Sequence, residues 1–157
     1  MKQILRVLLA MLLLGTLCGI APAMDLTALD RVTITMTKSE VLSLLGEPDE
    51  VTEIGNGLKA EVYTVNGLEP MVGTGCIYEN NRRLVGQSFI FQGEMDRIAA
   101  DRLVELGFSV MEDTEGNIRL LGKDDDTGRP LVATLSHDKD MTIIMTFEKG
   151  FYDRQVK

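Results

Sequence analysis

The chain has 157 residues and carries 16 Lys and Arg against 24 Asp and Glu, which gives a formal net charge of −8. Nucleic-acid-binding domains usually present a basic patch, so this charge argues against contact with a phosphate backbone. Two cysteines are too few for a small fold held together by disulfides, and 45% hydrophobic residues is typical of a globular domain. With a single His and no Trp, few side chains are available for catalysis or metal binding.

The first 23 residues have the pattern of a secretory signal peptide. Lys2 and Arg6 form a basic start, an apolar stretch covers 7–17, and Ala-Pro-Ala at 21–23 precedes the expected cleavage site. The alternative is a membrane anchor, but the apolar stretch is shorter than the roughly 20 residues that span a bilayer. Cleavage after residue 23 removes two cations and no acid. We therefore expect a periplasmic or secreted chain of 134 residues with net charge −10 and no membrane span.

The two cysteines have different expected roles. Lipidation of Cys18 would need a small residue before it, and Leu17 stands there, so we favour cleavage over a lipid anchor. Cys76 is then the remaining thiol. No His neighbours it in the sequence and the chain has no Cys-x-x-Cys pair, which favours a half-buried strand residue that acts as a small hydrophobe. The alternative is a reactive or intermolecular thiol.

The clearest predicted element is a short helix over 38–45. Thr37 and Glu40 have the spacing of a capping box, in which each side chain accepts a hydrogen bond from the other residue's backbone N–H. Apolar residues then follow at helical spacing. Gly46 can take the left-handed conformation that ends a helix, and Pro48 prevents its continuation.

Further elements follow in an order that occurs twice. Strands are predicted at 60–65, 73–79 and 84–92, then a second helix at about 94–106, then strands at 108–112, 117–122, 130–136 and 141–148. We therefore predict an α+β fold for a single mature domain, 24–157. It would consist of two tandem units of a helix plus antiparallel strands, at about 34–92 and 93–150. Together they would form one antiparallel sheet with the helices on one face.

A weak internal repeat supports the two units. At an offset of 61 residues, Leu45-Gly46 recurs as Leu106-Gly107, and Gly55-Asn56 recurs as Gly116-Asn117. Leu and Gly are common residues, so the matching order of elements is the stronger argument for a repeat.

The strand pattern also predicts which side chains face a partner. Asn80-Asn81 can form a two-residue hairpin loop, because Asn tolerates positive φ. That register places an aliphatic set on one face: Ile77, Leu84 and Ile90. It places a second set on the other face: Cys76, Tyr78, Val85, Phe89 and Phe91.

We expect the aliphatic set to face the helices, together with Met141, Ile143, Met145 and Phe147 from the last strand. The opposite face would then carry Ile144 and the expected partner-binding residues, which are Tyr78, Phe89, Phe91, Thr142 and Thr146. The alternative is that the aromatic residues are core and that the aliphatic set lies beneath segment 25–33.

No motif predicts catalytic residues, a cofactor or a metal. The acidic run at 124–128 invites comparison with an EF-hand loop, but Leu135 stands at position 12 where that loop needs Glu. A solvated hairpin loop is the better interpretation. His137 lies in an expected turn without a second His or Cys nearby, which makes it a poor metal ligand.

The segment 34–49 resembles the opening signature of the SmpA/OmlA family, small envelope proteins whose helix-and-strands fold is shared by the β-lactamase inhibitor protein. The matching positions are Met36, Thr37, Val41, Leu45, Gly46 and Pro48. Tyr63 and the turn Asn80-Asn81 leading to Arg83-Leu84-Val85 also fit the family pattern. Thr35 replaces the usual Gly before Met36. The resemblance covers about residues 30–92, and 93–150 would match as a repeat.

These observations, with the resemblance, point to a non-catalytic periplasmic binding or scaffold module. It would act through contacts with a protein partner in the bacterial cell envelope, and not through nucleic acid. The alternative function is a protein inhibitor of a secreted enzyme, which would use the sheet face and loops to block an active site. An enzyme would need a pocket with convergent titratable groups, and the sequence offers no motif for one.

The predicted capping box can be tested by replacing Thr37 with Ala. The variant should lose about 1 kcal/mol of unfolding free energy, because one N–H in the first turn of the helix loses its acceptor. Thermal or urea denaturation of the mature chain measures this. An unchanged midpoint would mean that the helix does not begin at this cap.

Overall fold

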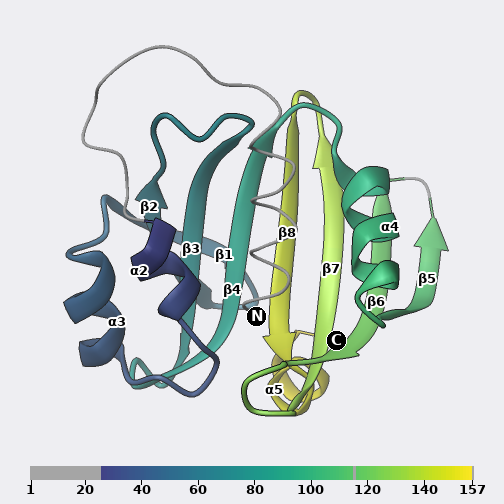
Figure 1. Cartoon of the computed structure of the whole chain (residues 1–157). Helices are drawn as coiled ribbons and strands as arrows, with labels where there is room; N and C mark the ends of the chain where they lie inside the picture. Colours follow the sequence, from purple (N-terminus) through teal and green to yellow (C-terminus); the bar gives the residue numbers. More distant parts are fainter. Residues whose placement is uncertain (1–25, 115, 157) are drawn as a thin grey trace.

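The protein is described here by a computed structural model that covers residues 26–114 and 116–156, so the predicted signal peptide and Cys18 lie outside the described residues. Eight strands form one antiparallel sheet in the order β1-β2-β3-β4-β8-β7-β6-β5 (Figure 1). The strands are β1 (Glu50–Gly55), β2 (Leu58–Thr64), β3 (Met71–Glu79), β4 (Arg83–Gln92), β5 (Ser109–Thr114), β6 (Asn117–Lys123), β7 (Pro130–Asp138) and β8 (Met141–Glu148). The helices are α2 (Leu26–Arg31), α3 (Lys38–Leu45), α4 (Asp96–Glu105) and α5 (Lys149–Gln155). The predicted α+β class is confirmed.

The helix with the strongest local signals has the predicted bounds. At the start of α3 the Glu40 N–H donates to Thr37 Oγ1 at 3.3 Å, and the Thr37 N–H donates to Glu40 Oε2 at 2.7 Å, so the capping box is formed. Gly46 ends the helix with φ 81°. These signals act within a few residues of chain, which is why the sequence alone predicts them.

Three elements of the structure were not predicted from the sequence: β1, α2 and α5. β1 is an edge strand whose side chains are exposed or half-buried, so it lacks the clean alternation that marks a strand. α2 and α5 have six and seven residues, too few for a helical period to stand out.

The order of a helix followed by four antiparallel strands occurs twice, in α3-β1-β2-β3-β4 and in α4-β5-β6-β7-β8. The last strands of these two stretches, β4 and β8, pair at the centre of the sheet, and the first strands, β1 and β5, form its two edges.

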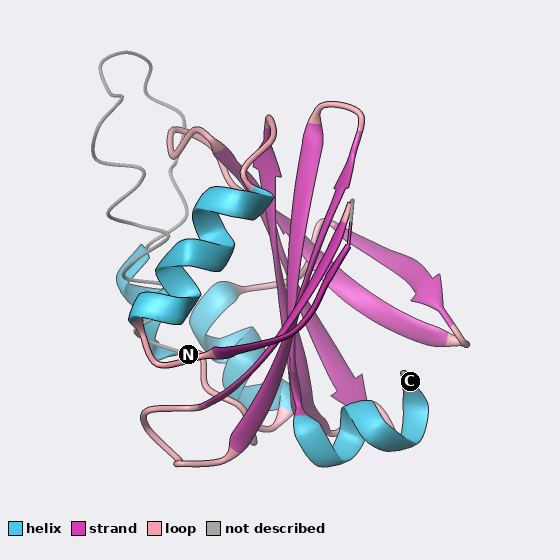
Figure 2. Ribbon diagram, turned by 90° about the vertical axis from the view of Figure 1, so that its right-hand side faces the viewer, coloured by secondary structure: helices cyan, strands magenta, loops and turns pink. Residues whose placement is uncertain are grey.

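The helices do not all lie on one face, which corrects the prediction. Residues of α2, α3 and α4 pack in the main core on one side of the sheet, and α5 packs on the other side (Figure 2). Phe147 on β8 stacks on Phe151 of α5, with ring centroids 6.3 Å apart. Gly86 makes room for this contact, because a Cβ there would lie 2.6 Å from the Phe147 ring.

The predicted hairpin register is wrong because the connecting turn has three residues and because β4 contains a bulge. Ile77 pairs with Gly86 whereas Tyr78 pairs with Leu84, so Val85 is the extra residue. The connecting turn has Asn80 and Asn81 at positive φ, as expected, but Arg82 also belongs to it. The bulge moves Leu84 onto the face of Phe89 and Phe91, and moves Val85 onto the face of Ile77.

The expected orientation of the two faces is also reversed. Phe89 and Phe91 are 1% exposed and lie in the core beneath the helices, and Tyr78 packs against the same core. Ile144 lies in the same core, while Phe147 and Met145 lie on the α5 side. The alternative prediction, in which the aromatic residues belong to the core, is right for Phe89 and Phe91. Its second part is wrong for Ile77, which lies against α5 and not beneath segment 25–33.

The two threonines of the expected partner surface are buried as well. Thr142 is 0% exposed; its Oγ1 accepts from the Met95 N–H at 2.8 Å and donates to the Gly93 carbonyl at 2.7 Å. Thr146 is 0% exposed and donates to the Gln87 carbonyl at 3.2 Å. Both hydroxyls satisfy backbone groups, so the prediction that they contact a partner is wrong.

Thr35 holds a backbone conformation that a β-branched residue rarely adopts, with φ 88°. Its N–H donates to the Leu84 carbonyl at 3.0 Å, and the Leu84 N–H donates to the Met36 carbonyl at 2.7 Å. These two hydrogen bonds hold the segment before α3 against β4 and maintain the strained φ.

Replacing Thr35 with Gly should therefore raise the unfolding free energy by about 1 kcal/mol. Relief of the strained φ, about 1–3 kcal/mol, outweighs the extra chain entropy of Gly, about 0.5–1 kcal/mol. Urea denaturation measures the change, and Thr35→Val, which keeps the β-branch, is the control that should show no gain. A midpoint below that of the parent for Thr35→Gly would contradict the account.

Candidate functional site

The sheet face on the α5 side carries an area with a single charged residue next to that helix. Cross-strand partners share a face, so the pairs across six strands define two neighbouring rows. One row is Thr64, Gly73, Ile90, Ile143, Ser136 and Asn117, and the other is Val62, Gly75, Ser88, Met145, Thr134 and Arg119. We call these twelve residues the open face. Arg119 is its one charged member and forms an ion pair with Glu112 at 2.5 Å.

The open face is apolar at its centre. Val62, Ile90, Ile143 and Met145 are half-buried, and none of the described helices except α5 packs on this side of the sheet. For a chain in which a quarter of the residues are charged, an area six strands wide with one charge is uncommon. Depletion of charge around apolar side chains is typical of the centre of a protein–protein interface.

A second feature is an opening between β2 and β3. Their ladder ends at the pair Ala60–Ile77, although both strands continue past it: β2 begins at Leu58 and β3 ends at Glu79. At the matching place in the other half, every residue of β6 pairs with β7. We call the opening between the diverging ends of β2 and β3 the wedge.

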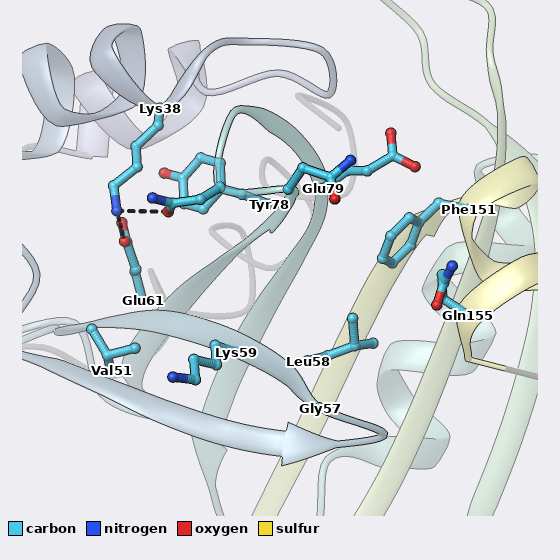
Figure 3. Close-up of a pocket in the computed structure, with 12 residues that line it drawn as sticks. Lys38, Val51, Gly57, Leu58, Lys59, Glu61, Tyr78, Glu79, Phe151 and Gln155 are labelled. Atoms are coloured by element: carbon cyan, nitrogen blue, oxygen red, sulfur yellow. Dashed lines mark hydrogen bonds and ion pairs between the residues drawn. The ribbon is translucent and has the colours of Figure 1, made fainter.

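The wedge contains a cavity of about 670 Å³. Side chains from α3, β1, β2, β3, the β3–β4 turn and α5 surround it (Figure 3). Leu58 and Phe151 give it an apolar wall, and Val51, which is 55% exposed, lies at its rim. Cavities of this size are in the range that takes small molecules or short chain segments.

The polar end of the wedge is built around Glu61 and Lys38. Glu61 is 7% exposed, and its Oε1 accepts a hydrogen bond from Lys38 Nζ, while its Oε2 accepts none from the described residues. Lys38 Nζ also donates to Asn81 Oδ1 at 3.0 Å and lies 5.7 Å from the centre of the Tyr78 ring. An ammonium has three donors, so one remains for a ligand.

The neighbouring titratable side chains on the helix face are neutral at physiological pH. Burial raises the pKa of the Cys76 thiol to about 12, and burial raises the pKa of Tyr63 and of Tyr78 above the usual tyrosine value. The Tyr78 hydroxyl is buried and has no oxygen or nitrogen partner among the described residues. A protonated thiol is a poor nucleophile, so this cluster is suited to packing and hydrogen bonding and not to covalent chemistry.

One wall of the wedge is tied down by a chain of ion pairs. Arg154 on α5 contacts Glu79 at 2.9 Å, and Arg83 contacts both Glu79 at 3.0 Å and Glu148 at 2.5 Å. The hydrogen bond from Arg83 holds the pKa of Glu79 below its usual value of 4.5. These contacts fix α5 against the end of β3, so Phe151 keeps its place in the cavity wall.

The described residues hold no group of three or more His, Cys, Asp or Glu that could bind a metal ion. In the acidic loop, Asp124 Oδ1 accepts from the Thr127 N–H at 2.8 Å and from the Asp126 N–H at 3.1 Å, so its carboxylate organises its own turn. His137 lies on β7, and the turn that follows is Lys139-Asp140. No helix in the described part of the chain is long and apolar enough to cross a membrane.

Of the five predicted partner residues, Tyr78 alone lines the wedge, and the other four are buried elsewhere. Lys38 and Glu61 were not predicted from the sequence. A signal for Glu61 was present, since it is the one charged residue in the predicted strand 60–65. Lys38 gave no signal, because a lysine in the first turn of a helix is ordinarily solvated.

No known family model matches this chain, and neither does any curated protein. A solved structure that is similar belongs to an extracellular protein containing an SCP domain from Bacillus anthracis str. Ames. The two share 15% sequence identity with a TM-score of 0.43, over 90% of this chain and 51% of the other. This chain therefore spans about half the length of that protein, and the resemblance to the SmpA/OmlA family stays a prediction.

The state of Cys76 can be tested by thiol labelling of the mature protein at pH 8. The native protein should not react with a maleimide or a disulfide reagent, because the thiol is buried and protonated, and one thiol should react after unfolding in urea. The control is Ser109→Cys in a Cys76→Ala background. Its thiol lies on an exposed strand, so it should react rapidly with the reagent in the native protein. Fast labelling of native Cys76 would favour the reactive thiol.

Proposed function

We propose that this protein is a non-catalytic binding module of the bacterial cell envelope that contacts a protein partner through the open face. The observation that carries the proposal is an area six strands wide that has apolar side chains at its centre and one charged residue, Arg119. Such an area excludes water well when a partner covers it, and it would otherwise remain in contact with solvent. The protonated state of Cys76 and of both tyrosines supports a role in binding and not in catalysis.

The proposal includes the periplasmic location and the two-unit organisation predicted from the sequence. The signal-peptide pattern at 1–23 supports export, with cleavage favoured over lipidation of Cys18. Two tandem units are supported by the repeated order of elements and by the echoed glycines. Gly46 and Gly107 follow the two helices with φ of 81° and 89°, and Gly55 and Gly116 precede the second strands with φ of 102° and 77°.

A photo-crosslinking amino acid tests the binding face in cells that produce the protein. At position 143, on the open face, it should form covalent adducts with a partner protein. At position 98, the probe replaces Ile98, which is 50% exposed on α4 and so faces solvent on the other side of the sheet. We expect no adduct there.

Adducts at position 98 with none at position 143 would contradict the proposed face. No adduct at position 143 or at position 90, its cross-strand neighbour, would contradict a protein partner on the open face altogether.

A further inference from the structure

We infer that the wedge binds an extended peptide segment, which pairs with the free edges of β2 and β3 and places an amide group between Lys38 and Glu61. The inference rests on the proposed function, since it names the part of a protein partner that this site would take. It concerns a different part of the molecule from the open face, so the two can fail separately.

The backbone of the wedge has strand edges that a peptide can pair with. Leu58 and Lys59 pair with β1 and not with β3, and Tyr78 and Glu79 pair with β4 and not with β2. Backbone N–H and C=O groups along these two edges therefore lack ladder partners. An unpaired strand edge is a template for another strand, and a peptide added there gains backbone hydrogen bonds whatever its sequence.

Hydrogen-bond donors and acceptors at the polar end of the wedge are arranged to fit an amide group. Glu61 Oε2 is a buried acceptor without a donor, which is costly unless a ligand supplies one. Beside it, Lys38 has a donor left over after its bonds to Glu61 and Asn81. An acceptor next to a donor matches the N–H and the C=O of an amide.

The same arrangement argues against other ligands. A cation at Glu61 Oε2 would be repelled by the Lys38 ammonium that already neutralises this carboxylate. An anion bound to Lys38 would be repelled by the nearby Glu61 carboxylate. A peptide group is neutral and polar, and the side chains that flank it can rest on Leu58 and Phe151.

The test uses the mature protein and a displayed library of random peptides of about ten residues, free of any assumption about the natural partner. Enriched peptides are synthesised and their affinities measured by calorimetry. They should bind the parent protein and perturb the backbone amide signals of Lys59 and Tyr78 in an NMR titration. N-methylation of the central amides of a peptide should weaken binding at least about tenfold, because it removes the strand hydrogen bonds.

Two variants of the protein locate the site. Leu58→Trp fills the apolar end of the wedge, and Glu61→Gln keeps the shape of the polar end but replaces the free carboxylate oxygen. Each should weaken peptide binding at least about tenfold. Val110→Trp, on the exposed edge strand β5, is the matched control and should bind as the parent does. Thermal denaturation of each variant shows whether the fold is kept.

The inference is overturned if no peptide is enriched, or if enriched peptides bind Leu58→Trp and Glu61→Gln as tightly as the parent. It is also overturned if n-propylguanidinium, which has no peptide group, binds as well as the peptides, since the site would then take a single basic side chain. Crosslinking at position 143 in the Leu58→Trp background separates the two proposals. If adducts form in the Leu58→Trp protein, the open face binds a partner without the wedge. If adducts form neither in the parent nor in the Leu58→Trp protein, the proposed function is contradicted.

Discussion

The ladder between β4 and β8 is the constraint on which the rest of the structure depends. It runs from the pair Gly86–Phe147 to the pair Gln92–Met141 without a register shift, and it joins the two halves of the chain into one sheet. Without it, each half would be a four-stranded sheet with an apolar edge, covered on one face by α2 and α3 or by α4. With it, Phe89 and Ile144 lie side by side under the helices, and their burial in a continuous core drives the two halves together.

The two faces of the sheet that this ladder completes are covered by helices to different extents. The helix face receives α2, α3 and α4 and is sealed with side chains that are almost wholly buried. The opposite face receives α5 alone, which covers the region around Phe147 and leaves the rows through Ile90 and Met145 half-buried. The open face is thus a consequence of having one short helix on a sheet eight strands wide.

The two halves differ where β2 and β3 diverge. Burial of a carboxylate costs its hydration free energy. A salt bridge offsets this cost only in part unless further hydrogen bonds are made to the carboxylate oxygens. Glu61 has Lys38 on one oxygen and nothing on the other among the described residues, so this end of the sheet holds an incompletely satisfied polar group. In the other half, Ile118 and Leu120 occupy β6 on the helix side and every residue of β6 pairs with β7. A charged pair in place of apolar residues at one end of a sheet lowers the stability of the fold. In natural proteins such a loss of stability usually occurs at a functional site.

The sequence by itself determined the parts of the structure that depend on a few neighbouring residues. The capping box of α3, the glycine that ends it, the two asparagines of the β3–β4 turn and the bounds of β8 follow from local hydrogen bonding, from allowed φ values and from alternation. The bulge at Val85 has no such local signature. Because one extra residue interrupts the alternation along β4, Leu84 and Val85 were assigned to the wrong faces, whereas Tyr78, Phe89 and Phe91 share one face as predicted. The tertiary structure alone decided which face the helices cover, and it alone brought Lys38 to Glu61, 23 residues away, because those outcomes depend on how distant segments pack and not on what each segment prefers.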